Sequence, residues 1–210
     1  LNSQGMSRLA VARDLIKKFA VFFASGGEMI SWFDIFYPDP EAKIVGSNGE
    51  SFDVFNSKYN FYSPKLTAVA YYNMINGICI KKVVDSKLYG DETEAVLFRD
   101  RDGKCMLIIW KEKERKDVFL PLDNVGPVRF LRIDGSSAAL DAKGKGLTLT
   151  LSEDPLVLFF ESKDMKLPEK LGEPSVSLAG DIIPVIKGEG TSLSFKLNGI
   201  SPDDISLLAP

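Results

Sequence analysis

Carboxylates are the side chains of this sequence that could carry out acid–base chemistry. Such chemistry needs two carboxyl groups, one acting as a general acid and the other as a base or nucleophile, at a defined separation. Nothing in the spacing of the early acids fixes such a separation, so we predict no catalytic pair within the chain. The acids that cluster in the first third are Glu28, Asp34, Asp39, Glu41, Glu50 and Asp53.

Other catalytic and metal-binding schemes lack their usual residues. The sequence contains no histidine, which removes Ser-His-Asp and Cys-His nucleophilic schemes and the commonest transition-metal ligand. The run Asp100-Arg101-Asp102-Gly103 is superficially similar to a calcium loop, but it lacks the later acidic ligands, so we interpret it as a hairpin turn. We therefore predict no metal site and expect no cofactor.

Two cysteines and one tryptophan leave alternatives open. Cys79 and Cys105 lie in apolar stretches, where buried thiols are the simpler interpretation and a single disulfide is the alternative. Trp110 ends an apolar run, and we expect it to pack between two sheets. A carbohydrate-binding platform is the other role for this ring.

Composition restricts the class of protein. The chain has 210 residues, enough for one or two domains, and a net charge of −3 with both signs interspersed. A nucleic-acid-binding protein would normally carry a basic surplus. No apolar run approaches the roughly 20 residues of a membrane helix, and the first residues show no targeting segment. We expect no nucleic-acid or membrane partner, and both extracellular and cytoplasmic locations stay open.

The best-specified unit is residues 83–162, where we predict an antiparallel β-sandwich. Short β-rich runs follow one another closely and are separated by Gly, Asp, Asn and Pro, as in sandwiches and barrels. Residues 147–151, Leu-Thr-Leu-Thr-Leu, alternate strictly, which indicates one buried and one solvated face. The charged run at 111–116 is interpreted as a solvated hairpin tip.

Residues 1–82 are predicted to form an α-β-α segment. Apolar residues of 7–24 repeat at three- and four-residue steps, and Gly26-Gly27 follows them as a helix stop. Residues 29–33 are predicted to be a short strand, and residues 34–63 a long aromatic-rich loop. Ser63 is the expected N-cap, with Pro64 at the first position, of a second helix that ends near residue 80. Residues 81–94 are expected to be a charged connector.

The remaining residues, 163–210, are predicted to hold a linker and an additional β segment. Residues 162–172 are rich in Lys, Glu, Asp and Pro. Weaker strands are expected around 176–178, 185–186 and 193–197. The fold class is therefore mainly β with a helical N-terminal part.

In this order, the elements resemble the C-terminal part of a clan A glycoside hydrolase, in which the last βα unit of a (β/α)8 barrel leads into a C-terminal β-sandwich. Residues 7–32, with their Gly-Gly break and Met-Ile-Ser-Trp, are similar to the seventh helix and eighth strand of such barrels. Residues 63–74, Ser-Pro-Lys-Leu-Thr-Ala-Val-Ala-Tyr-Tyr-Asn-Met, resemble the opening of the eighth helix. Residues 96–160 are similar to the sandwich that follows.

This resemblance implies a carbohydrate partner and a substrate cleft near Trp32. Trp32 would lie at the mouth of the eighth strand, where a ring can stack on a sugar, and Asp34 could hydrogen-bond a sugar hydroxyl. A buried Trp and a turn-capping Asp are the alternatives. Both catalytic carboxylates of the family would precede Leu1. The chain alone is therefore expected to be inactive, and the missing barrel portion or a partner chain would complete it.

Two other functions stay open. The chain could be a non-catalytic carbohydrate-binding module, whose exposed aromatics would form a flat row, or a structural β-sandwich module. The presence of a longer native polypeptide or a partner chain would separate the enzyme portion from both alternatives.

Overall fold

The computed structural model describes residues 7–31, 54–56, 63–122, 125–140, 146–178 and 195–198. Within these residues the chain is mainly antiparallel β with two helices, α1 (Arg8–Ala24) and α3 (Leu66–Ile78). This confirms the predicted class of a mainly β chain with a helical N-terminal part. The strands are β1 (Phe55–Asn56), β2 (Ser63–Pro64), β3 (Lys82–Tyr89), β4 (Thr93–Arg99), β5 (Lys104–Lys111), β6 (Lys116–Pro121), β7 (Val128–Leu131), β8 (Ser137–Leu140), β9 (Gly146–Leu151), β10 (Leu156–Glu161), β11 (Ser175–Leu178) and β12 (Phe195–Asn198).

A six-stranded antiparallel sheet lies at the centre of the molecule. Its strand order is β3-β4-β5-β10-β7-β8. The β4–β5 hairpin turns at Asp100, whose carboxylate accepts hydrogen bonds from the backbone N–H groups of Asp102 and Lys104, both at 2.9 Å. Gly103 has φ +90°, a conformation that favours glycine. The predicted hairpin turn is confirmed.

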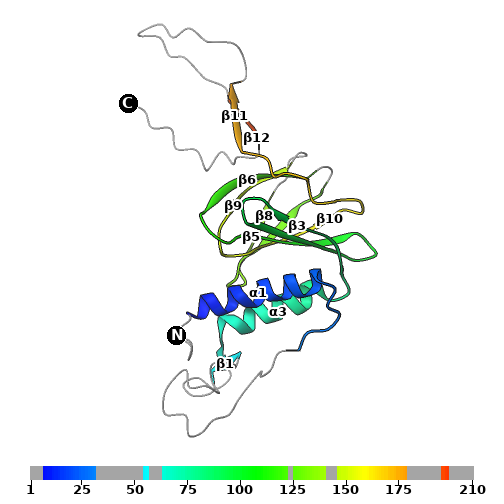
Figure 1. Ribbon diagram of the computed structural model, residues 1–210, viewed down its shortest axis with the longest axis vertical. Helices are drawn as coiled ribbons and strands as arrows, with labels where there is room; N and C mark the ends of the chain where they lie inside the picture. The colour runs from blue at the N-terminus through cyan, green and yellow to red at the C-terminus, as the bar shows by residue number, and fades with distance from the viewer. Residues whose placement is uncertain are drawn as a thin grey trace.

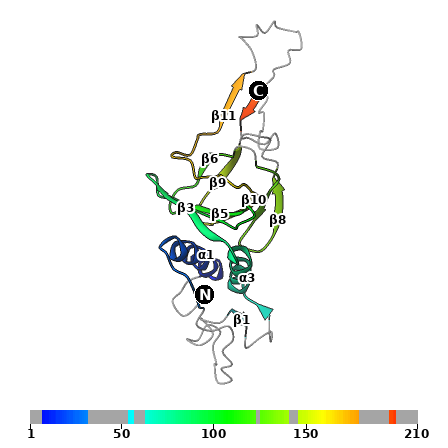
Figure 2. The same ribbon diagram turned by 90° about the vertical axis from the view of Figure 1, so that its right-hand side faces the viewer.

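The two faces of this sheet are covered by different elements. Figures 1 and 2 show α1 and α3 on one side and the two-stranded sheet β6–β9 on the other. Strand β5 is buried on both faces because it lies between these layers, and its side chains alternate between two cores. Met106, Ile108 and Trp110 belong to the helix side, and Cys105, Leu107 and Ile109 belong to the β6–β9 side.

The β6–β9 side explains the strict alternation of residues 147–151. Leu147, Leu149 and Leu151 of β9 are buried against the six-stranded sheet, and the threonines between them are half-buried. The pairing of Val118 with Leu149 and of Leu120 with Leu147 places β6 in the same layer. One buried and one wetter face is the arrangement that the alternation predicts.

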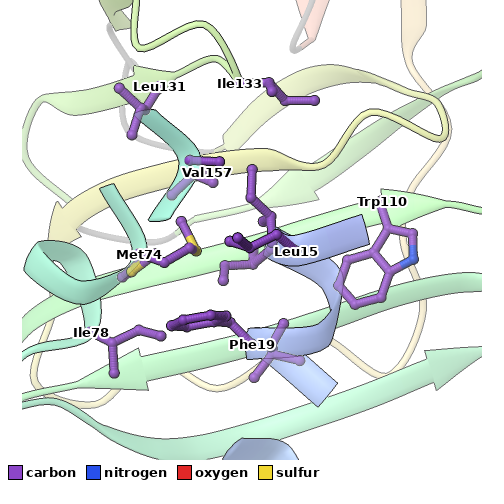
Figure 3. Close-up of a cluster of buried hydrophobic side chains, with 14 of the residues drawn as sticks. Leu15, Phe19, Met74, Ile78, Trp110, Leu131, Ile133 and Val157 are labelled. Carbon is purple, nitrogen blue, oxygen red and sulfur yellow. The ribbon is translucent and has the colours of Figure 1, made fainter. Parts of the chain in front are cut away.

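The helix side forms the second core. Figure 3 shows Leu15 and Phe19 of α1 and Met74 and Ile78 of α3 gathered over the sheet near Trp110. Helix α1 begins where the sequence indicates, because the Ser7 hydroxyl accepts a hydrogen bond from the Ala10 N–H at 3.1 Å.

Several local predictions were wrong. The stretch predicted as a charged connector contains β3, whose side chains alternate in exposure because it is an edge strand pairing only with β4. Residues 29–31 form no strand, and Met29 is 82% exposed. Helix α3 starts two residues later than expected, because Ser63 and Pro64 pair with β1 and Lys65 takes the N-cap position.

The charged run after β5 also differs from its prediction. Lys111 belongs to β5 and is largely buried, and the run that follows carries the chain from the six-stranded sheet to β6 in the other sheet. It is therefore a crossing connection between two sheets and not the tip of a hairpin. Charged side chains of this run form ion pairs, for example Lys113 with Glu92 at 2.7 Å.

Residues 162–172, predicted as a linker, pack along the sheet. Leu167 is 3% exposed and belongs to the core between the sheets. The backbone N–H of Leu167 donates to the Asp85 carboxylate at 2.8 Å, and the Tyr89 hydroxyl donates to the Pro168 carbonyl at 3.0 Å. The next strands, β11 and β12, pair with each other. The predicted domain boundaries at residues 82 and 162 stay predictions.

Candidate functional site

The two helices run in the same direction. Leu9 in the first turn of α1 and Leu66 at the start of α3 line one groove. Further along, the rings of Phe19 and Tyr71 meet edge to face, with centroids 5.9 Å apart. The first turns of the two helices therefore lie close together, and so do their middle turns. The helix pair is parallel.

Helix α3 is apolar on more than one side. No Asp, Glu, Lys or Arg occurs between Leu66 and Ile78. Ala70, Met74 and Ile78 face the sheet, whereas Tyr72 is 64% exposed and Ile75 is 43% exposed. A helix without charges is normally covered all round.

Helix α1 contributes to the same kind of surface. Val21 and Phe22 are exposed although both are large and apolar. We call Val21, Phe22, Tyr72 and Ile75 the outer apolar face of the helix pair. The face is mixed at its α1 side, where Lys18 pairs with Asp14 at 2.6 Å. Exposed apolar side chains that lie together often mark a contact site, whereas single exposed apolar side chains are common on any protein surface.

Ion pairs hold α1 on the sheet. Arg13 donates to the carboxylates of Glu153 and Asp154 in the β9–β10 turn, the latter at 2.8 Å. Lys17 lies 2.9 Å from the Glu112 carboxylate, which also accepts a 2.7 Å hydrogen bond from the Trp110 indole N–H. Partial burial disfavours ionisation of Glu112, yet the hydrogen bonds from Lys17 and Trp110 lower the pKa of its carboxyl below the ordinary value.

A groove of about 400 Å³ opens where the first turns of both helices meet the sheet. Its apolar floor includes Pro155 and Ile133, which are buried. Exposed charges stand at its rim, namely Arg115, Arg132 and Asp134. The described lining residues are Leu9, Leu66, Arg115, Phe130, Arg132, Ile133, Asp134, Thr150, Ser152, Asp154, Pro155 and Leu156.

The charged side chains that line the groove differ in the ion pairs and hydrogen bonds that they form. Asp154 is bound by Arg13. Asp134 accepts a 2.8 Å hydrogen bond from the Ser136 N–H, and the bonds from Ser136, together with the charge of Arg132, lower the pKa of its carboxyl. In the described part of the chain, neither Arg115 nor Arg132 forms an ion pair. The Arg132 guanidinium stacks over Phe130, 5.6 Å from the ring centroid.

The predicted substrate-binding residues, Trp32 and Asp34, lie outside the described residues and stay predictions. The same holds for the acids at 39, 41, 50 and 53. Glu28 is exposed. Within the described ranges no cluster of three or more His, Cys, Asp or Glu side chains could hold a metal ion.

The predictions for Trp110 and the cysteines need correction. Trp110 is 1% exposed, so it cannot serve as a surface platform, and it packs under the helices and not between the two sheets. Its place in β5 decides this, because successive side chains of a strand point to opposite faces. Cys105 is a buried thiol as expected, whereas Cys79 is exposed, and both are free.

Sequence reasoning did not find the groove. Its two aspartates follow strands in turns rich in Ser, Gly and Pro, which is a visible but common signal. The floor forms only because α1 and α3 bring Leu9 and Leu66 to the ends of β7 and β9. No local pattern indicates that meeting.

Comparison with known proteins bears on the fold. No family model and no curated protein matches the chain. A solved family 39 glycoside hydrolase from the gut symbiont Bacteroides cellulosilyticus WH2 superposes with a TM-score of 0.55 at 19% sequence identity, covering 75% of this chain. The fold resembles that of a glycoside hydrolase. The chain spans 31% of that enzyme's length, and at this identity the likeness concerns the fold alone.

A second solved structure is less similar. It is an alpha-N-acetylgalactosaminidase candidate from Bacillus halodurans C-125, with a TM-score of 0.34 and 16% identity, covering 49% of this chain and 26% of that one. Only the first comparison therefore bears on the fold.

Proposed function

We propose that this chain is the C-terminal portion of a glycoside hydrolase. Helices α1 and α3 would belong to the last βα units of a barrel, and the six-stranded sheet with β6–β9 would form the supporting β-sandwich. The two carboxylates that hydrolyse the O-glycosidic bond would lie outside the chain. The observation that carries this proposal is a parallel helix pair with apolar side chains on both its sheet side and its outer apolar face.

The parallel direction supports the barrel assignment. Two helices joined by a short loop usually form an antiparallel hairpin, but α1 and α3 are far apart in the sequence. Parallel neighbours need a segment that runs back between them, which in a βα barrel is a strand. The 41 residues between Ala24 and Leu66 are enough for such a strand.

The outer apolar face supports a missing layer. The sheet already covers the inner side, where Leu15, Phe19 and Met74 are buried. Covering a large apolar side chain completely contributes about 1.5–3 kcal/mol relative to leaving it in water. Strands of the remaining barrel, from the same polypeptide or a partner chain, would cover Tyr72, Ile75 and their neighbours.

The substrate role of Trp32 and Asp34 belongs to this proposal. Residues 29–31 form no strand here; joined to the remaining strands of a barrel they would form its last strand, and Trp32 and Asp34 would lie at the face where active sites lie. Trp32 would stack on a sugar ring, and Asp34 would accept a hydrogen bond from a hydroxyl. Carbohydrate is then the substrate class.

The test is the composition of the native protein. An antibody raised against residues 146–178 would isolate it, and intact mass spectrometry with light scattering would give its mass and assembly. We expect a much longer polypeptide, or this chain bound to a second one of a few hundred residues. A native protein of 210 residues that stays alone would contradict the proposal.

The alternative is a non-catalytic carbohydrate-binding or structural module. Its named platform, Trp110, is buried, so a flat aromatic row at that position is not available. The groove at the ends of the helices is the feature that favours sugar binding, and it is compatible with both functions.

A further inference from the structure

We propose that the groove between the helix starts and the β9–β10 turn is a binding site for a neutral saccharide. The inference rests on the proposed function only in taking sugars as the ligands that this protein meets. The site itself is argued from the groove, its charges and its floor.

The β9–β10 turn lies between the two arginines. The pairing of Lys116 with Leu151 places Arg115 beside Ser152, where β9 ends. The pairing of Leu131 with Val157 places Arg132 beside Leu156, where β10 begins. The turn residues Ser152 and Asp154, and the buried Pro155, line the groove between them.

Helix α1 engages the acids of this turn. Glu153 and Asp154 are the acids of the turn, and Arg13 binds both. Arg115 and Arg132 therefore keep exposed guanidinium groups in the described structure, without an ion pair there. Each such group offers several N–H donors in a fixed plane.

An acceptor stands beside these donors. The exposed Asp134 carboxylate accepts hydrogen bonds from the hydroxyl and the N–H of Ser136, which lower the pKa of its carboxyl, and it is ionised at neutral pH. An ionised carboxylate is an acceptor only and has about four lone-pair sites on its two oxygens, so Asp134 keeps acceptor sites for a ligand hydroxyl. The groove thus combines donor-only and acceptor-only groups over an apolar floor of Pro155 and Ile133.

This combination fits sugar hydroxyls better than it fits an anion. A hydroxyl both donates and accepts, so neighbouring hydroxyls can bind Asp134 and Arg132 at once. The C–H face of a sugar ring can then rest on the apolar floor. A phosphate or sulfate would be attracted by Arg115 and Arg132 but would also meet the Asp134 carboxylate, which has the same sign of charge, so it fits the groove less completely than a group that both donates and accepts. The volume of about 400 Å³ lies in the roughly 300–1,000 Å³ range of small-ligand sites.

The test is calorimetric titration of the 210-residue protein with neutral hexasaccharides built from xylose, glucose, mannose or galactose. At least one is expected to bind, and Arg132→Ala and Asp134→Asn should each weaken it about tenfold, because each removes a hydrogen bond to a charged group. Asparagine keeps an oxygen for the Ser136 N–H, so the turn is preserved. The matched controls, Arg101→Ala and Asp102→Asn in the exposed β4–β5 turn, should bind like the unchanged protein.

Inorganic phosphate and sulfate form the second arm of the titration. Binding of these anions without binding of any hexasaccharide would overturn the proposal and leave an anion site. No binding at all, or saccharide binding that neither groove variant weakens, would overturn it as well. The titration does not depend on the mass or assembly of the native protein. A failure of the saccharide site can therefore be distinguished from a failure of the proposed function.

Discussion

At the residue scale, buried and ion-paired side chains attach the helices to the sheet. Trp110 packs in the helix-side core, and its indole N–H donates to Glu112. Lys17 from α1 binds the same carboxylate and lies 5.8 Å from the centre of the Trp110 ring. The end of β5 is therefore attached to α1 both by a buried core contact and by an ion pair.

Trp110→Ala is expected to destabilise the protein by about 3–5 kcal/mol, since it empties a buried site of this size. Urea unfolding of both proteins measures the difference. Leu88→Ala is the matched control, because Leu88 is exposed, and it should change the free energy of unfolding by less than about 0.5 kcal/mol. A Trp110→Ala variant as stable as the control would show that the ring is not buried.

Glu112→Gln is expected to cost less than about 1 kcal/mol at neutral pH, because the carboxylate is partly solvated and screened. The pKa of Glu112 is lowered in the folded protein from an ordinary value of 4.5. Its ionisation therefore stabilises the fold fully above that value, and the contribution is lost as the pH falls through the lower folded pKa. Unfolding at about pH 7 and about pH 3.5 should show a smaller deficit of the variant at the lower pH. An equal deficit at both would refute the assigned ion pair.

At the element scale, helix α3 and the segment after β10 each have more contacts than their place in the chain suggests. Helix α3 buries Met74 against the sheet and exposes Tyr72 and Ile75 on its other side. The segment after β10 holds the edge strand β3 through Leu167 and Pro168. Neither segment is a simple surface element or a simple linker.

The double substitution of Tyr72→Lys and Ile75→Lys is expected to leave the isolated chain folded, because both side chains are exposed. It should reduce binding of an apolar dye to the chain and abolish assembly with the native barrel portion. Far-UV circular dichroism, dye fluorescence and co-purification measure these effects. Met74→Lys is the contrast and should unfold the chain, because it buries an unpaired charge. A double variant that still assembles would refute the outer apolar face as the contact.

Leu167→Ala is expected to destabilise the protein by about 2–5 kcal/mol, which is the range for buried leucines. The neighbouring exposed Lys166→Ala is the control and should be nearly neutral. Thermal unfolding separates the two variants. If Leu167→Ala were also neutral, the segment would be the linker that its composition suggests.

At the scale of the whole molecule, three layers share two cores. The helix pair, the six-stranded sheet and β6–β9 are stacked, and the central strand β5 contributes side chains to both cores. Neither helix in the described residues is long and apolar enough to cross a membrane. The layer order leaves the outer apolar face at one end of the stack.

The purified 210-residue chain is expected not to hydrolyse aryl glycosides or polysaccharides, because the proposal places both catalytic carboxylates outside it. A chromogenic assay with a panel of aryl glycosides measures this. Turnover that disappears when one of the chain's own acids, such as Glu28, is replaced would contradict the prediction. Turnover that survives every such replacement would indicate a contaminating enzyme.

The sequence alone determined the features that local chemistry controls. The span of α1 follows from apolar spacing, the Ser7 cap and the Gly26 stop. The β4–β5 turn follows from Asp100 and Gly103, and the buried side of β9 follows from its alternation. Each depends on neighbours in the chain, so the pattern is visible in one dimension.

Only the tertiary structure decided what depends on distant partners. The charges of β3 suggested a connector, but pairing with β4 makes it an edge strand. Trp110 could face either core, and the register of β5 puts it under the helices. The groove forms where α1 and α3 bring Leu9 and Leu66 to the ends of β7 and β9, and Arg13 of α1 binds the acids of a turn 140 residues away. Contacts across such separations leave no periodic trace in a sequence, and the free energy of packing selects among the arrangements that local propensity allows.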